Sequence, residues 1–375
     1  MGVTRTIIMK EANVMNVVKE ISVDTYDDLF AQTDLTPLQS SAWGKSRGNT
    51  WKSKYFTIDD IPVLVLLRKI PFMNKYFAYV PWGFSDAVID KIGKDMFAQG
   101  LKALSDELFQ KYGVEYLIVD PYVTKEHLNI SEQGKKNQLQ PQYTNILKLD
   151  GDIDQLFKNF KRSHRANIRK AKRAGLHVKV FTRDNCTGEE ACSHVLDELY
   201  AVLKSVALRT DYVIRPKLYY SNVLRNLLQS DNGAVLSIYS SQDELLASGL
   251  ISIAKSRVVE LYGGATDAGL KNFAAYLLKY EQIKFSLEQG KEFYDHFGIA
   301  PFTIVTREDG VHYEYAKDHH LYGISSFKEG FGGLPVRLLP QIVFANGSRG
   351  KFIYSVGNWA QKLAVSIAKI RKGSH

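Results

Sequence analysis

The feature that most constrains the fold of this chain is an order of predicted elements that occurs twice. Strand, helix, strands, helix and strand follow one another in residues 20–125 and again in residues 143–298. In the first stretch, β-branched and aromatic residues alternate over 53–83, and the period becomes helical over 85–112. No sequence repeat is visible between the two stretches. The pattern therefore predicts two α/β units of one type in a chain of 375 residues.

The remaining elements are predicted from apolar periodicity and from Gly and Pro at their ends. The predicted strands are 114–122, 143–150, 176–182, 234–240, 245–253, 256–263 and 291–298, and the predicted helices are 154–174, 189–208, 216–229 and 271–290. The polar stretch 125–142 predicts a loop. The tail 351–372 predicts an amphipathic helix, and its apolar face would hold Val356, Trp359, Leu363, Ile367 and Ile370.

Several classes of protein are disfavoured by the composition. The longest apolar run, IPVLVLL at 61–67, is far shorter than the about 20 residues that a membrane-spanning helix needs. Two cysteines, Cys186 and Cys192, are too few for a disulfide framework and suit a reducing cytosol. No His or Cys cluster has metal-ligand spacing, because the neighbours His319 and His320 rarely face one ion. We therefore expect a cytoplasmic protein with no metal and no cofactor.

The net charge of the chain is concentrated in one segment. Residues 158–183 contain ten Lys or Arg and no Asp or Glu, whereas the whole chain contains 49 basic and 40 acidic residues. Without these ten residues the basic count would be 39, one fewer than the acidic count. The excess of +9 therefore comes from a localised patch and not from a generally basic surface.

The centre of this patch is the predicted helix at 154–174. Its buried stripe is expected to hold Phe157, Phe160, His164, Ile168 and Ala171, which recur at helical spacing. Its outer face carries the candidate contacts Lys161, Arg162, Arg165, Arg169 and Arg173. Like charges four residues apart destabilise a helix, and no Glu on that face compensates them. The face is either simply solvated or contacts an anionic partner, which would be RNA phosphates or an anionic lipid surface.

Six segments in order along the chain carry a resemblance to a known family. They are LQSSAWGK (38–45), YLIVDPY (116–122), YTNILKLDGDIDQLFKNFKRSHRANIRKAKRAGLHVKV (143–180), ALRTDYVIRPKLYY (207–220), LYGGATDAGLKNFAAYLLKYEQIKFSLEQGKEFYDHFGI (261–299) and SSFKEGFGG (325–333). YGG and FKxGFGG are the most specific motifs among them. In order and spacing these segments resemble the FemABX family of aminoacyl-tRNA-dependent peptidyl transferases, and the resemblance covers residues 20–345.

The resemblance implies an α/β (α+β) fold with two GNAT-like domains, that is, domains like the acyl-CoA N-acyltransferases. The first domain is expected at 16–152, completed by the C-terminal segment 340–375, and the second at 153–339. No heptad insertion is visible, so the chain resembles the compact type without a coiled-coil arm. The implied reaction moves an aminoacyl group from aminoacyl-tRNA to the stem-peptide amine of a peptidoglycan precursor, either lipid II or UDP-MurNAc-pentapeptide.

Three residues are candidates for the chemistry of this reaction. Ester aminolysis requires a neutral, positioned amine and a stabilised tetrahedral oxyanion, and it needs no nucleophilic triad. By the resemblance, Lys328 would stabilise the oxyanion or the tRNA end, and Phe327 would pack beside the acceptor. Asp120, at a strand end, would accept the proton of the amine or bind an ammonium group. The alternatives are a surface lysine in a glycine-rich turn and an aspartate that caps a turn.

Six residues are candidates for binding the acceptor. Arg215 and Tyr219 resemble a pair that holds the diphosphate of the precursor, because a guanidinium can donate two parallel hydrogen bonds to phosphate. Near Trp43 the family places a lysine that also contacts phosphate. Lys45 and Arg47 both fit that place, with a preference for Arg47.

The sixth candidate, Tyr262 of YGG, would line the acceptor site or would be a core tyrosine at a strand end. One insertion departs from the compact members: TREDGVHYEYAKDHHLYGI (306–324), which predicts a loop near the donor site.

Two other functions stay open at the level of sequence. The same fold could use acyl-CoA, but Glu260 before GGA and Phe327 before GFG do not match the R/Q-x-x-G-x-G/A pyrophosphate loop. A non-enzymatic RNA-binding protein would explain only the basic helix. The partners we expect are an aminoacyl-tRNA donor, a peptidoglycan precursor and a peripheral contact with the inner leaflet of the membrane, without DNA.

Overall fold

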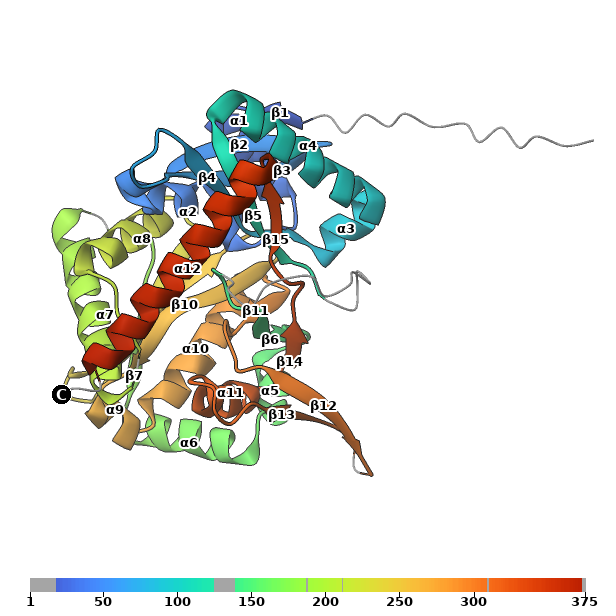
Figure 1. Cartoon of the computed structure of the whole chain (residues 1–375). Coiled ribbons are helices and arrows are strands. Elements are labelled where there is room, and N and C mark those ends of the chain that lie inside the picture. The colour runs from blue at the N-terminus through green and yellow to red at the C-terminus, as the bar shows by residue number, and fades with distance from the viewer. Residues whose placement is uncertain (1–17, 125–138, 187, 211, 309, 373–375) are drawn as a thin grey trace, which may run out of the picture.

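Two mixed β-sheets organise the protein in a computed structural model that describes residues 18–124, 139–186, 188–210, 212–308 and 310–372. Figure 1 shows the sheets one above the other with helices around them, and helix α12 (Gly347–Lys372) runs diagonally across the front. Most of the predicted loop at 125–142 lies outside the described residues. The side chains of 360–372 also lie outside them, so Leu363, Ile367 and Ile370 are not placed.

The first sheet has six strands. They are β1 (Val18–Glu20), β2 (Lys52–Ile58), β3 (Ile61–Lys69), β4 (Tyr76–Ser85), β5 (Val114–Tyr122) and β15 (Ile342–Ala345). Strands β1 to β4 are antiparallel neighbours, β5 is parallel to β4, and β15 is antiparallel to β5. The last strand comes from the far end of the chain, and it aligns Ile342 with Val119.

The second sheet has seven strands. They are β7 (His177–Phe181), β8 (Gly233–Tyr239), β9 (Leu245–Ile253), β10 (Arg257–Ala265), β11 (Phe293–Asp295), β6 (Tyr143–Lys148) and β14 (Leu334–Arg337). Strands β7 to β10 are antiparallel neighbours, β11 is parallel to β10, and β6 is antiparallel to β11. The two sheets therefore share one plan, with a single parallel pair at the same place in each.

The helices also occupy equivalent places in the two halves. They are α1 (Val23–Gln32) and α2 (Ser41–Ser46) between β1 and β2, α7 (Glu189–Arg209) and α8 (Lys217–Gln229) between β7 and β8, α3 (Asp86–Ile92) and α4 (Lys94–Tyr112) between β4 and β5, and α9 (Asp267–Lys271) and α10 (Ala274–Glu288) between β10 and β11. This arrangement confirms the two α/β units of one type that the repeated element order predicts, and it agrees with the two GNAT-like domains that the resemblance implies.

The boundary between the sheets falls earlier than the sequence predicts. β6 ends at Lys148 and belongs to the second sheet, where it pairs with β11 and β14. A boundary before residue 143 therefore fits the sheets better than one at 152. The C-terminal segment 340–375 contributes β15 to the first sheet.

The predicted helix at 154–174 is wrong in one respect, because it is two helices. Helix α5 (Ile153–Asn159) begins at a capping box between Asp152 and Gln155, and helix α6 (Arg162–Arg173) follows it. Between them, Phe160 has an extended backbone and packs edge-to-face on Phe331, with ring centroids 5.4 Å apart. The inward turn of this aromatic side chain interrupts the helix.

The insertion at 306–324 is also more regular than a loop. It completes the two-stranded hairpin of β12 (Phe302–Arg307) and β13 (Gly310–Tyr315), which Figure 1 shows projecting from the lower right of the molecule. Helix α11 (Tyr322–Glu329) follows the hairpin and carries the FKEGFGG motif. Two short 3₁₀ helices, η1 (Pro37–Gln39) and η2 (Gly48–Thr50), flank α2.

Candidate active site

Helix α2 brings the segment LQSSAWGK against the second half of the molecule. Ser40 caps this helix, since its hydroxyl accepts a hydrogen bond from the Trp43 backbone N–H at 3.1 Å. A Cβ at Gly44 would come within 2.6 Å of Ser53 Oγ on β2, so the absence of a side chain lets α2 approach the first sheet. Arg47 follows directly as the C-terminal cap. The helix therefore fixes the direction in which Arg47 leaves the first domain.

Arg47 joins residues from both sheets in one cluster. Its guanidinium lies 3.8 Å from the centre of the Trp43 ring, and its Nη1 donates a hydrogen bond to the Tyr219 hydroxyl at 2.8 Å. The Tyr219 hydroxyl is 2.8 Å from that of Tyr262. We call Trp43, Arg47, Tyr219 and Tyr262 the acceptor cluster. Four of the six predicted acceptor-binding residues thus contact one another, although they come from α2, α8 and β10.

The position of Tyr262 depends on an irregularity of strand β10. The register between β9 and β10 shifts between Glu260 and Tyr262, and such a bulge redirects the side chains that follow it. The Tyr262 ring packs on Tyr220 with centroids 5.1 Å apart. Burial raises the pKa of Tyr262 well above its ordinary value, although Arg47 opposes this shift. The phenol is therefore neutral and acts as a hydrogen-bonding group.

The other two acceptor candidates lie outside this set of contacts. Lys45 is exposed on α2, so Arg47 is the cation of this segment that faces the cluster. Arg215 is exposed, and its backbone N–H donates to the Tyr220 hydroxyl at 3.2 Å. Its guanidinium has no ion pair among the described residues. Arg215 therefore remains available to a ligand beside Tyr219.

Asp120 is buried and fully hydrogen-bonded. Its carboxylate accepts from the Tyr79 hydroxyl at 2.7 Å, from the Gln140 backbone N–H at 3.0 Å and from Gln341 Nε2 at 3.1 Å. Burial raises the pKa of Asp120, while these donors oppose the shift. Burial also raises the pKa of Tyr79 well above its usual value, and the charge of Arg47 lowers it. Asp120 is therefore linked through Tyr79 to the surroundings of the acceptor cluster.

Lys328 lies in the interior of the second unit. Its Nζ donates to the carbonyl oxygens of Gly298 at 2.8 Å and Phe297 at 3.1 Å, and its side chain is buried. Burial lowers the pKa of this amine to about 8. The predicted alternative of a surface lysine is therefore wrong. A buried amine with this lowered pKa can be charged or neutral near pH 8, which suits stabilisation or transfer of charge in a closed site.

Phe327 is held by the basic helix. His164 on α6 donates from Nε2 to the Phe327 carbonyl oxygen at 3.0 Å, and the two rings are 5.8 Å apart. A Cβ at Gly330 would come within 2.1 Å of the His164 ring, so glycine is required for this approach. Burial lowers the pKa of His164, which therefore stays neutral near pH 7. Helix α6 thus positions the FKEGFGG segment from below.

Two polar side chains near Lys328 have no hydrogen-bond partner among the described residues. They are His296 and Asn145, both fully buried, and the His296 backbone N–H donates to the Asn145 carbonyl oxygen at 2.9 Å. Burial lowers the pKa of His296 well below its ordinary value, and the positive charges of Lys279 and Lys328 add to the effect. A neutral, unpaired polar group therefore lies beside the buried lysine.

Several side chains of the basic segment 158–183 form ion pairs or hydrogen bonds within the protein, which the sequence alone does not show. Lys161 pairs with Glu329 at 3.0 Å and Lys172 with Glu281 at 3.6 Å, both on other helices. Arg165 donates from Nη1 to the carbonyl oxygen of Phe160 at 2.7 Å, so it ties α6 to the end of α5.

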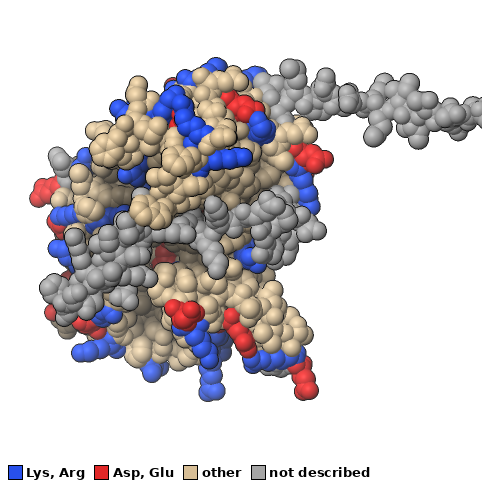
Figure 2. Space-filling view, viewed as in Figure 1, with Lys and Arg blue, Asp and Glu red and all other residues tan. Residues whose placement is uncertain are grey.

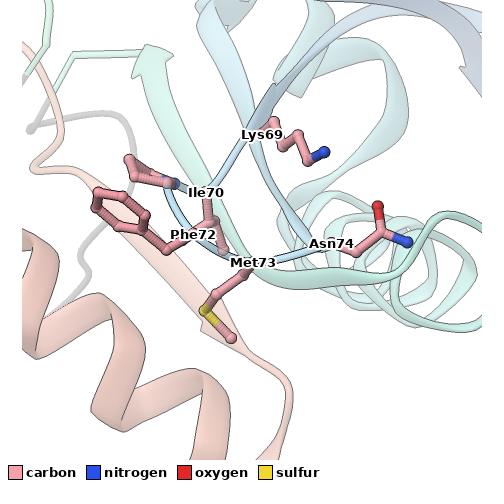
Figure 3. A pocket seen from close by; sticks show the side chains of 6 residues that line it. Lys69, Ile70, Phe72, Met73 and Asn74 are labelled. Atoms are coloured by element: carbon pink, nitrogen blue, oxygen red, sulfur yellow. The ribbon is translucent and has the colours of Figure 1, made fainter.

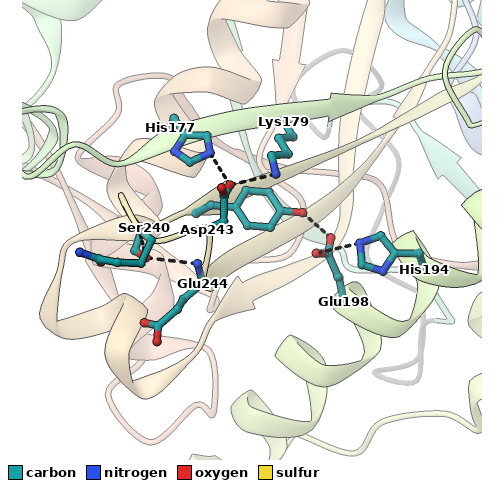
Figure 4. A network of polar contacts seen from close by, with 9 residues as sticks. His177, Lys179, His194, Glu198, Ser240, Asp243 and Glu244 are labelled. Carbon is teal, nitrogen blue, oxygen red and sulfur yellow. Dashed lines mark hydrogen bonds and ion pairs between the residues drawn. The ribbon is translucent and has the colours of Figure 1, made fainter.

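The basic residues on strand β7 and directly after it also have acidic partners. Figure 4 shows Asp243 accepting from His177 and Lys179, the latter at 3.0 Å, and Arg183 pairs with Asp231 at 2.9 Å. Among the described residues of the segment, Lys158 on α5 and Arg165 on α6 have no acidic partner, and neither have Arg162, Arg169, Lys170 and Arg173, which are exposed on α6. We call these four the basic face. Figure 2 shows blue side chains along the lower edge, where α6 lies in Figure 1.

One surface hollow lies away from all predicted site residues. It is lined by the turn between β3 and β4, residues 69–74, with Phe72 fully exposed (Figure 3). Because one turn supplies the whole lining, nothing converges on it from other elements. Among the described helices, none is long and apolar enough to cross a membrane.

A model of the FemAB family matches residues 126–238. The lipid II:glycine glycyltransferase of Staphylococcus haemolyticus (strain JCSC1435) is 22% identical and aligns with 77% of this chain and 71% of its own length.

Solved structures resemble the fold over nearly the full length. The crystal structure of FemX superimposes with a TM-score of 0.72 at 16% identity, covering 91% of this chain and 99% of FemX. The structure of L-PGS from Bacillus licheniformis superimposes with a TM-score of 0.51 at 14% identity, covering 90% of this chain and 96% of that one.

Proposed function

We propose that the chain is an aminoacyltransferase of peptidoglycan cross-bridge synthesis in the FemABX family, which the match of the FemAB family model and the similarity to the lipid II:glycine glycyltransferase support. The proposed reaction moves an aminoacyl group from the 3′ ester of an aminoacyl-tRNA to the stem-peptide amine of a peptidoglycan precursor. The amine nitrogen forms a bond to the ester carbonyl carbon, and the carbon–oxygen bond to the ribose then breaks. The amine loses a proton, and the ribose oxygen leaves as a hydroxyl. The bonds formed and broken in this reaction balance without an oxidant or a cofactor.

The observation that carries the proposal is the acceptor cluster. Arg47 donates to Tyr219 across 172 positions of sequence, so a cation and two phenols from both units line one place. Arg215 adds a second guanidinium four residues before Tyr219. Two guanidinium groups with hydroxyl donors suit a diphosphate, because each guanidinium can donate in parallel to two phosphate oxygens. We propose that the diphosphate of the precursor binds here.

Lys328 and its surroundings support the acyl-transfer step. In its ammonium form, the buried Nζ would donate to the oxyanion that forms on the ester carbonyl, and low solvent exposure strengthens that interaction. Phe327 would pack beside the reacting groups, with its backbone fixed by His164. The basic face of α6 would contact phosphates of the tRNA, without reading base sequence.

The hydrogen bonds of Asp120 favour a positioning role. Three donors already occupy the carboxylate, and one of them is the Tyr79 hydroxyl. We propose that Asp120 holds Tyr79 beside the acceptor cluster. A role as general base would require the amine to replace one of these donors.

Donor dependence is the decisive experiment. Purified protein is incubated with radiolabelled aminoacyl-tRNA and either lipid II or UDP-MurNAc-pentapeptide, with and without prior RNase treatment of the donor. We expect label on the precursor, and we expect RNase to abolish it. Transfer from acyl-CoA alone would replace the proposal with the N-acyltransferase of the same fold. Binding of RNA without any transfer would leave only an RNA-binding protein.

A further inference from the structure

The two cysteines of the chain lie next to each other where strand β7 leads into helix α7. Their Sγ atoms are 3.0 Å apart, and the Cys192 thiol also donates to the Cys186 carbonyl oxygen at 3.2 Å. Both are free thiols, and the sequence contains no other cysteine. The distance between the two sulfur atoms is only about 1 Å longer than a disulfide bond. We call Cys186 and Cys192 the dithiol.

Hydrogen bonds fix the backbone that carries Cys186. Its backbone N–H donates to the Thr182 carbonyl oxygen at 3.0 Å, and the Thr182 N–H donates to Asn185 Oδ1 at 2.8 Å. Asn185 Nδ2 donates in turn to the Val180 carbonyl oxygen of β7 at 2.7 Å. The turn after β7 therefore holds Cys186 in a fixed position relative to the second sheet.

Cys192 lies in the first turn of α7, at an end of the helix that has no side-chain cap. Gly188 is the N-cap residue, with φ 91°, and it has no side chain that could accept from the first turn. The Cys192 backbone N–H donates to the Gly188 carbonyl oxygen at 3.4 Å. Helix ends with weak local bonding open at little cost in free energy. A covalent link from Cys192 to the turn after β7 would therefore hold this end of α7 closed.

The two thiols differ in exposure, and this difference gives them different roles in thiol–disulfide exchange. Cys186 is buried in the larger hydrophobic core. Burial raises the pKa of the Cys186 thiol to about 12, and the contact with Cys192 adds to the effect. Cys192 is only partly buried. A dissolved reagent therefore meets Cys192 first, and Cys186 lies behind it as the resolving thiol.

We propose that the dithiol is a reversible thiol–disulfide site, at which a small disulfide such as oxidised glutathione converts Cys186 and Cys192 into an intramolecular disulfide. The Cys192 thiolate attacks one sulfur of the reagent, the S–S bond of the reagent breaks, and a first thiol leaves. Cys186 then attacks the Cys192 sulfur and releases the second thiol. The protons of the two cysteines end on the two released thiols. Two protein thiols are oxidised, and one small disulfide is reduced.

The dithiol lies at one end of a helix that packs on both elements of the second unit in the acceptor cluster. Helix α7 packs on β10 and on α8, which carry Tyr262 and Tyr219 (Figure 1). A Cβ at Gly264 would come within 2.4 Å of Val206 Cγ2, so α7 and β10 are in close contact. Oxidation would restrain this helix. The site itself goes beyond the proposed function, because its chemistry does not depend on aminoacyl transfer and its test needs no transfer assay.

The first measurement is the equilibrium between dithiol and disulfide in the full chain. Reduced protein is equilibrated with mixtures of reduced and oxidised glutathione and quenched with acid, and the free thiols are counted by alkylation and mass spectrometry. The titration is repeated in concentrated urea. We expect the equilibrium constant for the internal disulfide to be about tenfold or more larger in the folded protein, because the fold holds the two sulfur atoms together. By linkage, urea denaturation should show the oxidised protein to be more stable by the same factor.

Two matched variants, each lacking one thiol, assign the roles of the cysteines. In Cys186→Ser, we expect Cys192 to accumulate a glutathione adduct, because no second thiol resolves it. In Cys192→Ser, we expect the buried Cys186 to react with glutathione and with iodoacetamide about tenfold or more slowly. Circular dichroism and thermal unfolding establish that both variants are folded, and the wild-type titration needs neither of them.

Hydrogen exchange tests the effect of oxidation on α7. We expect the backbone amides in the first two turns of α7 to exchange about tenfold or more slowly in the oxidised protein. Those of α10 serve as the internal control and should not change.

Three outcomes would overturn the proposal. The first is a wild-type protein that keeps both thiols at every glutathione ratio or carries glutathione on Cys192 in place of the internal disulfide. The second is an equilibrium constant that is no larger in the folded protein than in urea. The third is an unchanged rate of exchange at the start of α7 after oxidation.

Discussion

Lys328 and Arg47 provide the two positive charges on which the proposed reaction depends, and their surroundings differ. Lys328 is buried against the backbone carbonyl oxygens of Phe297 and Gly298, and its pKa is lowered to about 8. Arg47 stacks on Trp43 and donates to Tyr219, at a part-buried place that both units line. The amine of Lys328 can therefore lose its charge within the physiological pH range, whereas the guanidinium of Arg47 stays protonated.

The lowered pKa of Lys328 predicts how turnover depends on pH. If the ammonium form stabilises the oxyanion, kcat falls as pH rises through about 8, because the charged form is lost there. We expect Lys328→Met to reduce kcat about 100-fold or more at pH 7. Lys328→Arg retains the charge and would keep its residual activity above pH 9, which a pH–rate profile would reveal.

The control for this prediction is the exposed Lys317→Met, which should leave kcat and its pH dependence unchanged. An unchanged kcat in Lys328→Met would remove this lysine from the reaction.

Arg47 and Lys45 can be distinguished by substitution. Arg47→Lys keeps a positive charge but loses the planar contact with Trp43 and the fork that can bind two phosphate oxygens. We expect it to raise acceptor KM about tenfold with little change in kcat. Lys45→Met should change neither value, since Lys45 is exposed and lies outside the acceptor cluster. A larger effect at Lys45 would assign the phosphate contact to that residue.

At the scale of elements, α6 combines a structural and an electrostatic role. His164, Ile168 and Ala171 are buried, and His164 fixes the backbone of Phe327. The basic face points outward from the same helix. A charged ligand on this face would therefore act on the element that supports FKEGFGG.

The residues of α6 should separate into two classes on substitution. We expect Arg162→Gln/Arg169→Gln/Arg173→Gln to weaken binding of aminoacyl-tRNA and to reduce the slope of log K against log salt by about 2. Arg165→Gln should instead lower the free energy of unfolding by about 1 kcal/mol, because Arg165 bonds to the end of α5. Salt titrations of binding and urea denaturation measure the two effects.

Lys69→Gln/Lys91→Gln/Lys94→Gln is the matched control for the charge change, with three exposed lysines of the first unit. If this variant reduces the salt slope as much as the α6 variant does, the basic face has no special role.

The buried stripe of α6 could be predicted from sequence because helical spacing alone specifies it. The break at Phe160 could not, since neither Gly nor Pro marks it and its cause is a contact with Phe331, 171 positions later in the sequence. Likewise Trp43, Arg47, Tyr219 and Tyr262 were candidates through family resemblance, whereas their mutual contacts come from the packing of α2 on α8.

Tyr79 could not be predicted, because it lies in an alternating strand without any motif. Its contribution appears only where its hydroxyl reaches Asp120. The acidic partners of the basic segment, Glu281 and Glu329, could not be predicted either. They lie on other helices, so the charges along one helix do not reveal them.

At the scale of the whole molecule, buried polar contacts join the two units. The Tyr122 hydroxyl of β5 donates to Asp295 of β11 at 2.6 Å, where both side chains are buried. Arg257 of β10 pairs with Asp34 of the first unit at 3.1 Å. These contacts hold the acceptor cluster and Lys328 in one fixed arrangement.

Loss of one such contact should destabilise the molecule as a whole. Tyr122→Phe removes a donor from a buried carboxylate, so we expect the free energy of unfolding to fall by about 1–3 kcal/mol. Urea denaturation followed by circular dichroism measures this change. Tyr112→Phe, which removes a hydroxyl bonded to Glu20 near the surface, should cost less than about 0.5 kcal/mol. If the two variants lose the same free energy of unfolding, the buried contact between the units stabilises the protein no more than a surface hydrogen bond does.

The return of strand β15 to the first sheet has a consequence for biosynthesis. Gln341, just before β15, bonds to Asp120 across 221 positions, so the first unit receives its last strand only after the second has been made. During translation, at about 5–20 residues per second, the edge of β5 stays unpaired for about 10 s or longer. Nascent chains must protect that edge from pairing with one another, and the first-made half of the protein is the last to be completed.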